Sequence, residues 1–314
     1  MIRLAIVSPC YNEEEILESS AGILLNVLDS LREEGSITND SFILFVNDGS
    51  KDSTWSIVSK LHNENSVIKG INLARNVGHQ NALMAGMMAV RNKCDAVVTI
   101  DSDLQDDVSA IGKMVDEFSR GHDVVYGVKV SREGDSFLKS FTAQAFYRFQ
   151  HRYAHIESVY NHADFRLLSS RVLDSLSNYS ESNLYLRGLI PLIGYPSTTV
   201  DDVISERKAG KCKYSLAKMI TLALEVITSF SSKPMMSIIR VGLIFTIVSV
   251  LMVLYVIIQF FNGKVVPGWS SLMVSLWFIG GAVLIALGVI GIYIGRIFIE
   301  VKRRPLYTIQ EELF

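Results

Sequence analysis

The sequence predicts an α/β protein with a doubly wound, mostly parallel sheet, followed by segments that enter a membrane. Two observations lead to this fold class. Short runs rich in β-branched residues alternate with segments whose apolar residues recur at helical spacing, as is typical of such a sheet. Two later stretches, residues 241–258 and 272–294, carry no charged side chain and are long enough to cross a bilayer. The length of 314 residues fits one large domain or two smaller ones.

Strand and helix segments alternate along the first half of the chain. We expect strands at residues 4–8, 42–46, 67–73, 96–100, 123–127 and 165–168. Helices are expected between the earlier strands, at residues 14–31, 54–63 and 82–91. A strand, a helix and a second parallel strand form a right-handed unit, so successive units build one sheet covered by helices.

Polar side chains follow three of these predicted strands at the point where each strand ends. Asn12 and Glu13 follow the first strand, Asp48 follows the second, and Asp101 and Asp103 follow the strand at residues 96–100. Open α/β sheets bind ligands at the carboxyl ends of their strands, where such a cleft could hydrogen-bond a ribose and a base. Each acid alone is also typical of a turn or a helix cap. Three in succession favour a binding site.

The acidic segment at residues 101–106 is the most informative of the three. Alternate residues of an extended segment point the same way, so Asp101, Asp103 and Gln105 can share one face. Two carboxylates and an amide oxygen suit Mg²⁺ or Mn²⁺ shared with the phosphates of a nucleotide. Taken alone, the D-x-D pattern is equally compatible with a solvated acidic turn.

Composition and missing motifs exclude several other functions. The net charge of −2 gives no support for nucleic-acid binding. Three widely spaced cysteines fit neither a disulfide framework nor a zinc site, and agree with a reducing cytosol. No G-x-G-x-x-G follows a strand, which argues against a dinucleotide-binding fold of the dehydrogenase type. The phosphate-loop pattern G-x-x-x-x-G-K-[ST] and the nucleophile-elbow pattern G-x-S-x-G are also absent from the sequence.

The two uncharged stretches predict a membrane hairpin, with helices at about residues 238–261 and 270–295. A buried helix of a soluble core is the alternative. Basic residues flank the hairpin on its outer ends, from Lys233 and Arg240 to Arg296 and residues 302–304, whereas the connecting loop holds only Lys264. By the positive-inside rule, both termini are cytoplasmic. The first residues show no signal-peptide pattern.

Motifs across the chain resemble glycosyltransferase family 2. In the sheet region these are Pro9-x-Tyr11-Asn12-Glu13, Val46-Asn47-Asp48-Gly49-Ser50-x-Asp52, Arg75-Asn76-x-Gly78 and Asp101-x-Asp103-Leu104-Gln105-Asp106. Three further segments resemble the polyprenyl-phosphate glycosyltransferases of that family, the group of bactoprenol glucosyltransferase and dolichol-phosphate mannose synthase. They are Asp164-Phe165-Arg166-Leu167-Leu168-Ser169, the basic segment at residues 207–215, and Arg304-Pro305-x-Tyr307. Ala163 and Cys212 depart from the family pattern, in which Gly and Ser are usual.

The resemblance implies the fold called GT-A and a role for each motif. The residues expected to hold a nucleotide-activated sugar are Pro9, Tyr11, Asn12, Glu13, Asp48, Arg75 and Asp101. Asp101, Asp103 and Gln105 are expected to hold Mg²⁺ or Mn²⁺. Arg75 could instead be a salt-bridged surface residue. The histidines, His79 among them, show no metal spacing and are expected at the surface or in packing.

Asp164 is the catalytic acid/base candidate that the resemblance implies, although capping of a turn is the alternative. The acceptor would be a phosphate monoester, whose second pKa of about 6 leaves it mostly dianionic at cytosolic pH. Such an acceptor needs little deprotonation, so we expect Asp164 mainly to orient the substrates. Arg132, Arg207 and Lys213 are the expected contacts of the lipid phosphate, with binding of anionic headgroups as the alternative.

The resulting organisation is a cytoplasmic catalytic domain at residues 1–214, an interfacial amphipathic helix at 215–236, a transmembrane hairpin at 237–299 and a cytoplasmic tail at 300–314. The predicted activity is inverting transfer of a hexose, glucose in the first instance, from a nucleotide-diphosphate sugar to undecaprenyl (bactoprenol) phosphate. It would serve cell-envelope glycan modification at the inner membrane, with a separate flippase and a downstream glycosyltransferase. Self-association through the hairpins is compatible with this organisation.

Three alternatives remain open from the sequence. The donor could be a GDP- or UDP-linked mannose or another sugar. A processive polysaccharide synthase would carry a Q-x-x-R-W motif and more membrane helices, whereas residues 183–188 here read Asn-Leu-Tyr-Leu-Arg-Gly. A non-enzymatic membrane subunit would have no use for acids at three strand ends.

Overall fold

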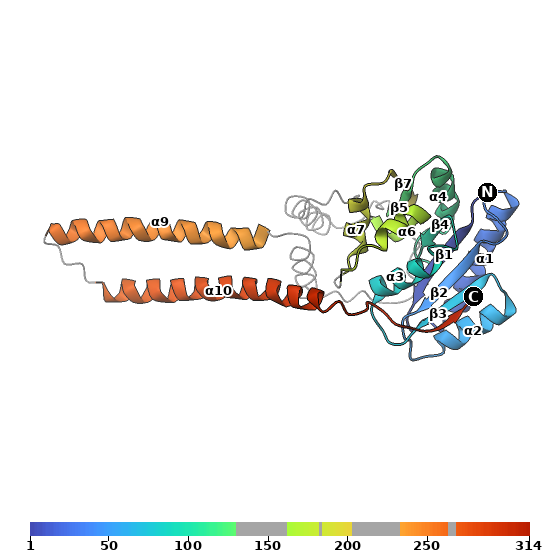
Figure 1. The fold of residues 1–314 in the computed structure, drawn as a ribbon, viewed down its shortest axis with the longest axis horizontal. Helices are drawn as coiled ribbons and strands as arrows, with labels where there is room; N and C mark the ends of the chain where they lie inside the picture. The colour runs from blue at the N-terminus through green and yellow to red at the C-terminus, as the bar shows by residue number, and fades with distance from the viewer. Residues whose placement is uncertain (130–161, 182–183, 203–232, 263–267) are drawn as a thin grey trace, which may run out of the picture. The chain divides into compact units, whose positions relative to one another are not determined.

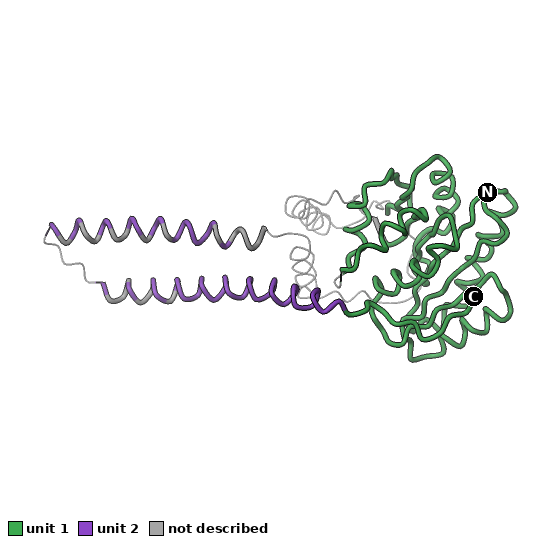
Figure 2. The backbone as a smooth tube through the Cα atoms, viewed as in Figure 1, with its two compact units in different colours: residues 1–213, 304–314 green, residues 214–303 purple. Residues whose placement is uncertain are grey.

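The computed structural model describes residues 1–129, 162–181, 184–202, 233–262 and 268–314 (Figure 1). The chain forms two compact units, which are described separately below. Met1–Lys213 and Arg304–Phe314 make up the first, and Tyr214–Arg303 the second (Figure 2).

The first unit is built on one sheet with the strand order β7-β5-β6-β4-β1-β2-β3-β8. The strands are β1 Leu4–Cys10, β2 Phe42–Asn47, β3 Ile68–Leu73, β4 Ala96–Thr99, β5 Val124–Lys129, β6 His162–Ser169, β7 Ser197–Asp202 and β8 Ile309–Leu313. Strands β3, β2, β1 and β4 pair in parallel, as do β5 and β7. Strand β6 runs antiparallel to β4 and β5, and β8 runs antiparallel to β3. The sheet is therefore mixed, with the predicted parallel arrangement at its centre.

Helices cover both faces of this sheet (Figure 1). They are α1 Leu17–Glu33, α2 Thr54–Glu64, α3 His79–Val90, α4 Ala110–Ser119, α6 Ser170–Leu176 and α7 Leu186–Ile193. Successive side chains of a strand point to opposite faces. Accordingly, Leu4 and Ile6 of β1 pack in a core with α1, α2 and α4, whereas Ala5 and Val7 pack in a second core with α3, α6 and α7.

Strand β1 lies between β2 and β4 and pairs in parallel with both. From β1 the chain moves outward through β2 and β3, and it then returns to the other side of β1 to form β4. This reversal makes a topological switch point between β1 and β4. Ligands of open α/β sheets bind in the crevice outside the carboxyl ends of the strands at such a point.

The C-terminal segment joins the sheet as strand β8, which the sequence did not predict. Its pairing with β3 continues into the next residue, because the Ala74 N–H donates to the Thr308 carbonyl at 2.9 Å. The Trp55 indole N–H donates to Glu311 Oε2 at 3.0 Å, and the Phe314 ring contacts Phe42 edge-on with centroids 6.4 Å apart. The sequence of this edge strand is mostly polar, so it lacks the apolar run by which the other strands were predicted.

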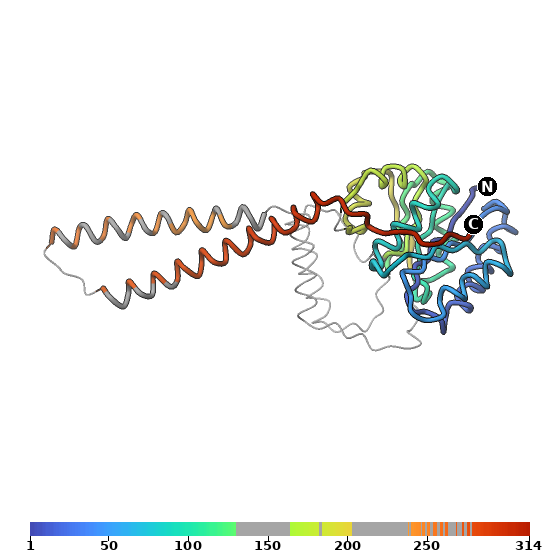
Figure 3. Tube along the Cα trace, turned by 60° about the horizontal axis from the view of Figure 1, so that its bottom comes forward, coloured from blue at the N-terminus to red at the C-terminus, as the bar shows by residue number. Residues whose placement is uncertain are grey.

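The second unit contains two long helices, α9 Lys233–Phe261 and α10 Trp269–Val301, which lie side by side (Figures 1 and 3). The rings of Phe245 and Phe278 meet between them at 5.3 Å. Among the described residues, one segment is long and apolar enough to cross a membrane, Phe278–Val301 in α10. Crossing by α9, and hence the predicted hairpin, stays a prediction. Residues 215–232 of the predicted interfacial helix lie outside the described residues.

Candidate active site

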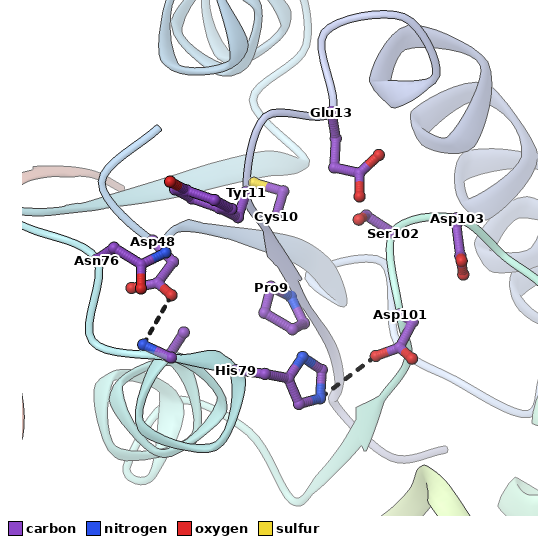
Figure 4. A pocket seen from close by; sticks show the side chains of 12 residues that line it. Pro9, Cys10, Tyr11, Glu13, Asp48, Asn76, His79, Asp101, Ser102 and Asp103 are labelled. Carbon is purple, nitrogen blue, oxygen red and sulfur yellow. Dashed lines mark hydrogen bonds and ion pairs between the residues drawn. The ribbon is translucent and has the colours of Figure 1, made fainter. Parts of the chain in front are cut away.

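A cavity of about 290 Å³ opens where β1, β2 and β4 end. Six of the predicted site residues line it, namely Pro9, Tyr11, Glu13, Asp48, Asp101 and Asp103 (Figure 4). The three strand ends therefore meet as the parallel topology requires. Three other predicted site residues do not line the cavity, although residues close to them in the sequence do: Asn12, Arg75 and Gln105.

Asn12 holds two site loops together. Its backbone is left-handed, with φ of 55°, and its Oδ1 accepts from the Lys51 N–H at 2.9 Å. Its own N–H donates to Ser50 Oγ at 3.0 Å, and the next residue, Glu13, donates its N–H to Thr54 Oγ1 at 2.9 Å. The structure thus gives Asn12 a positioning role between the loops after β1 and β2.

Asp48 fixes a third loop from its buried position at the end of β2. Its Oδ1 accepts from the Val77 N–H at 2.7 Å. Its Oδ2 accepts from the Gly78 N–H at 3.0 Å (Figure 4). Burial raises the pKa of Asp48, although these two N–H groups act in the opposite direction. Arg75, in the same loop, is exposed, and its Nη1 donates to the Asn76 carbonyl at 3.3 Å.

Gly49 is required where these loops touch. Its φ is +63°, a left-handed conformation that favours glycine. A Cβ atom there would lie 2.5 Å from both the Arg75 carbonyl carbon and the Asn76 nitrogen, which are backbone atoms. The Asp-Gly pair therefore sets the approach of the Arg75–Gly78 loop to the cavity.

Negative charge is concentrated on the other side of the cavity, at Glu13, Asp101 and Asp103 (Figure 4). Burial raises the pKa of Glu13, and the charges of Asp103, Asp52 and Asp101 raise it further. Burial also raises the pKa of Asp101, with His79 opposing the shift. A cation bound here would relieve the repulsion between these carboxylates.

The turn after β4 shapes this acidic group. Leu104 has a left-handed φ of 45°, and its N–H donates to the Asp101 carbonyl at 3.1 Å. The Gln105 amide donates to Asp103 Oδ2. No group of three or more His, Cys, Asp or Glu side chains in the described ranges is placed to hold a metal by itself. The donor set present, two carboxylates and an amide, instead fits an open Mg²⁺ or Mn²⁺ site that substrate phosphates complete.

Asp164, at the start of β6, is surrounded by cationic and amide donors. Arg166 Nη2 donates to its Oδ1 at 2.5 Å, and Arg187 donates from Nε to Oδ1 at 3.2 Å and from Nη2 to Oδ2 at 3.1 Å. Gln80 Nε2 donates to Oδ2 at 3.2 Å, and His79 Nε2 lies 3.4 Å from the same oxygen. Burial alone would raise the pKa of Asp164, but His79, Arg166 and Arg187 outweigh it and hold that pKa far below its usual range. These contacts favour the ionised form of Asp164.

His79 connects Asp164 to the acidic side of the cavity. Its Nε2 also lies 3.4 Å from Asp101 Oδ1, and the ring lines the cavity (Figure 4). Burial lowers the pKa of His79, but the two carboxylates outweigh this effect and raise it. His79 is exposed, in agreement with the expected surface position, but the sequence did not predict that it would line the cavity. Helix α3 begins at His79, three residues earlier than predicted, so this first-turn side chain reaches the site.

The acidic turn is also tied to the ends of β5 and β7. Lys129 Nζ lies 3.2 Å from Asp106 Oδ1, and the Asp107 N–H donates to Asp202 Oδ1 at 2.8 Å. Burial raises the pKa of Asp106 to about 7, against the effect of the Lys129 charge. The predicted acceptor residues Arg132, Arg207 and Lys213 lie outside the described residues.

The cavity lies where open α/β sheets bind their ligands, and sequence comparison gives the family of the chain. Residues 5–177 match the model of glycosyl transferase family 2. The uncharacterized glycosyltransferase YkoT of Bacillus subtilis (strain 168) is 46% identical over 99% of this chain and 92% of its own length. The chain belongs to glycosyltransferase family 2 and is a glycosyltransferase.

Two other relatives are similar over almost their whole lengths. The SfII prophage-derived bactoprenol glucosyl transferase of Shigella flexneri is 36% identical, with coverage of 99% of this chain and 98% of the relative. The prophage bactoprenol glucosyl transferase homolog of Escherichia coli (strain K12) is 34% identical, with coverage of 98% and 99%.

Replacement of Gly49 by Ala should weaken nucleotide binding. The added Cβ must push the Arg75–Asn76 backbone away, which misplaces the loop that Asp48 holds. We expect the Kd for a nucleoside diphosphate, measured by calorimetry, to rise at least about tenfold, since small misplacements in a site cost about that or more. Gly35→Ala is the matched control, because Gly35 also has a left-handed φ of +71° but only the Met1 side chain within 4 Å. Equal Kd values for the two variants would contradict this role of Gly49.

Replacement of Asp164 by Asn should destabilise the protein in a pH-dependent way. Loss of the anion leaves buried Arg166 uncompensated, which costs about 3 kcal/mol. Because the folded-state pKa of Asp164 is depressed, its contribution is present above the unfolded pKa of about 3.9 and is lost as pH falls below that value. The stability gap between wild type and variant, measured by thermal unfolding in detergent, should therefore shrink below about pH 4. A gap that stays constant in acid would argue against an ionised Asp164, and the exposed Asp116→Asn serves as the control variant.

Proposed function

We propose that this glycosyltransferase moves a hexose from a nucleotide-diphosphate sugar to a polyprenyl phosphate. The observation that carries the proposal is the cavity at the β1/β4 switch point, where Tyr11 and Asp48 face an acidic group across a space of about 290 Å³. The names of the Shigella and Escherichia relatives support the polyprenyl acceptor, because similarity to them extends over the full chain. Undecaprenyl phosphate and glucose are the substrates that these names favour.

The donor would lie with its nucleoside against Tyr11, Glu13 and Asp48 and its diphosphate toward Asp101 and Asp103. Departure of the nucleoside diphosphate concentrates negative charge on the leaving oxygens. Mg²⁺ or Mn²⁺, held by Asp101, Asp103 and Gln105, would supply Lewis-acid stabilisation of that charge. The mutual repulsion of Glu13, Asp101 and Asp103 supports a cation at this place.

Asp164 serves as an orienting anion in this proposal. Its depressed pKa makes it a weak base. The acceptor does not need a strong base, because a phosphate monoester with a second pKa of about 6 is already mostly dianionic. One acceptor oxygen attacks the anomeric carbon from the face opposite the departing diphosphate, so one C–O bond forms as another breaks and the configuration inverts.

The proposed membrane topology is based on the two helices of the second unit and on the basic residues that flank them. Helix α10 contains the segment that can span a bilayer, and α9 is the proposed second crossing, with the catalytic domain and both termini cytoplasmic. Arg132, Arg207 and Lys213 remain the proposed contacts of the acceptor phosphate. Flipping of the product and further sugar transfer are assigned to separate proteins, and self-association would run through the two helices.

Transfer in detergent tests this function directly. Purified protein, a polyprenyl phosphate, Mn²⁺ or Mg²⁺ and a panel of UDP- and GDP-sugars should yield lipid-linked sugar with one donor. Asp103→Ala should lower the rate at least about 100-fold, the effect typical of losing one electrostatic stabiliser. Asp116→Ala, which removes an exposed carboxylate on α4, should leave the rate unchanged.

Two results would contradict the proposal. Release of nucleoside diphosphate without lipid-linked product would indicate another acceptor. Full activity after chelation of divalent cations, or in Asp103→Ala, would remove the metal from the mechanism.

A further inference from the structure

Asn76 lies in the loop between β3 and α3, and its side chain lines the cavity (Figure 4). The residue is exposed, and within the described part of the chain its side-chain amide forms no hydrogen bond. An asparagine amide offers one acceptor oxygen and two N–H donors. This amide is therefore available to a ligand in the cavity.

The backbone is held on both sides of Asn76. Before it, the Ala74 N–H donates to the Thr308 carbonyl at 2.9 Å. After it, the Val77 N–H donates to Asp48 Oδ1 at 2.7 Å. A fixed backbone lowers the entropy lost when a side chain binds a ligand. The loop thus presents the Asn76 amide from a preorganised position.

The conformation of the loop does not explain why residue 76 is an asparagine. Asparagine is favoured in left-handed turns and at helix N-caps. The left-handed residues other than glycine in the described chain are Asn12, Leu104 and Arg303, and the N-cap of α3 is Gly78. Neither the backbone nor the helix therefore requires an amide at this position, which leaves recognition of a ligand as its role.

The surroundings of Asn76 indicate which part of a donor it would meet. Asp48 anchors the Asn76 loop, whereas Asp101 and Asp103 lie on the other side of the cavity (Figure 4). The side chain of Tyr11 is 42% exposed and also lines the cavity, so its ring can stack on a base. An asparagine amide can donate one hydrogen bond to the edge of a base and accept another from it.

We propose that Asn76 binds the Watson–Crick edge of the donor nucleobase and thereby contributes to donor selection. Uracil and guanine, the bases of the proposed UDP- and GDP-linked donors, both present a ring N–H beside a carbonyl on this edge. Asn76 Oδ1 would accept from that N–H, and its Nδ2 would donate to the carbonyl. The inference rests on the proposed function and names a specificity-determining residue of its donor site.

Calorimetry with the full chain in detergent tests the inference. UDP, GDP and pyrophosphate, which has no base, would each be titrated in the presence of Mn²⁺. Asn76→Ala should raise the Kd for the nucleotide that wild type prefers about 5- to 50-fold, the effect of losing two neutral hydrogen bonds, and should change the Kd for pyrophosphate less than about twofold.

Asn76→Asp separates base recognition from support of the loop. The carboxylate has nearly the same size as the amide but only accepts hydrogen bonds. Guanine can donate both its ring N–H and its amino group to a carboxylate, whereas uracil has one ring N–H between two carbonyls. The ratio of the Kd for UDP to the Kd for GDP should therefore rise at least about tenfold above the wild-type ratio, the scale of discrimination by one two-point contact. Repulsion of the diphosphate by the new charge cancels in this ratio.

Asn92→Ala and Asn92→Asp are the matched controls. Asn92 is also exposed, but it lies in the turn between α3 and β4, at the amino end of that strand. Neither variant should change a Kd or the ratio. If Asn76→Ala does not fold, the ratio measured for Asn76→Asp decides the matter.

The possible failures are distinguishable. An unchanged nucleotide Kd in Asn76→Ala, an equal loss of pyrophosphate affinity, or an unchanged ratio in Asn76→Asp would each overturn the inference, while lipid-linked product from wild type would still support the proposed function. No binding of either nucleotide to wild type would refute the proposed donor site and this inference with it.

Discussion

The structure depends on one constraint, the parallel pairing of β1 with both β2 and β4. Because the three strands run the same way, the loops that follow them must emerge at the same edge of the sheet, and the chain reversal between β1 and β4 leaves a crevice there. Tyr11, Asp48 and Asp101 meet in this crevice although they are far apart in the sequence. The loops are then locked to one another, through Asn12 on one side and Asp48 on the other.

Two groups of opposite charge lie side by side at this edge. Glu13, Asp101 and Asp103 form the negative group, and Arg166 and Arg187 surround Asp164 in the positive one, with His79 between them. In the proposed reaction, the negative group would hold a divalent cation beside the donor diphosphate. The donors around Asp164 lower its pKa, which favours the proposed orienting role over proton transfer.

The sequence predicted the central strands and the acids at their ends, because both are encoded locally, in short apolar runs and the residues that follow them. It did not reveal that His79 and Arg187 contact Asp164, because these contacts join α3, β6 and α7 and no single motif contains them. Strand β8 was missed because its alternation is weak and its partner β3 lies more than 200 residues earlier. The antiparallel course of β6 likewise follows from pairing partners rather than from its own apolar run.

Nucleotide-dependent stabilisation tests the central claim, that the β1/β4 edge is a metal-assisted nucleotide-sugar site, most directly. Thermal unfolding of the full chain in detergent would be followed with UDP or GDP, each with and without Mn²⁺. We expect one nucleotide to raise the melting temperature in the presence of Mn²⁺, with a clearly smaller shift when the metal is chelated, since a ligand stabilises the folded state that binds it. No shift with either nucleotide under any condition would contradict a nucleotide site at this edge.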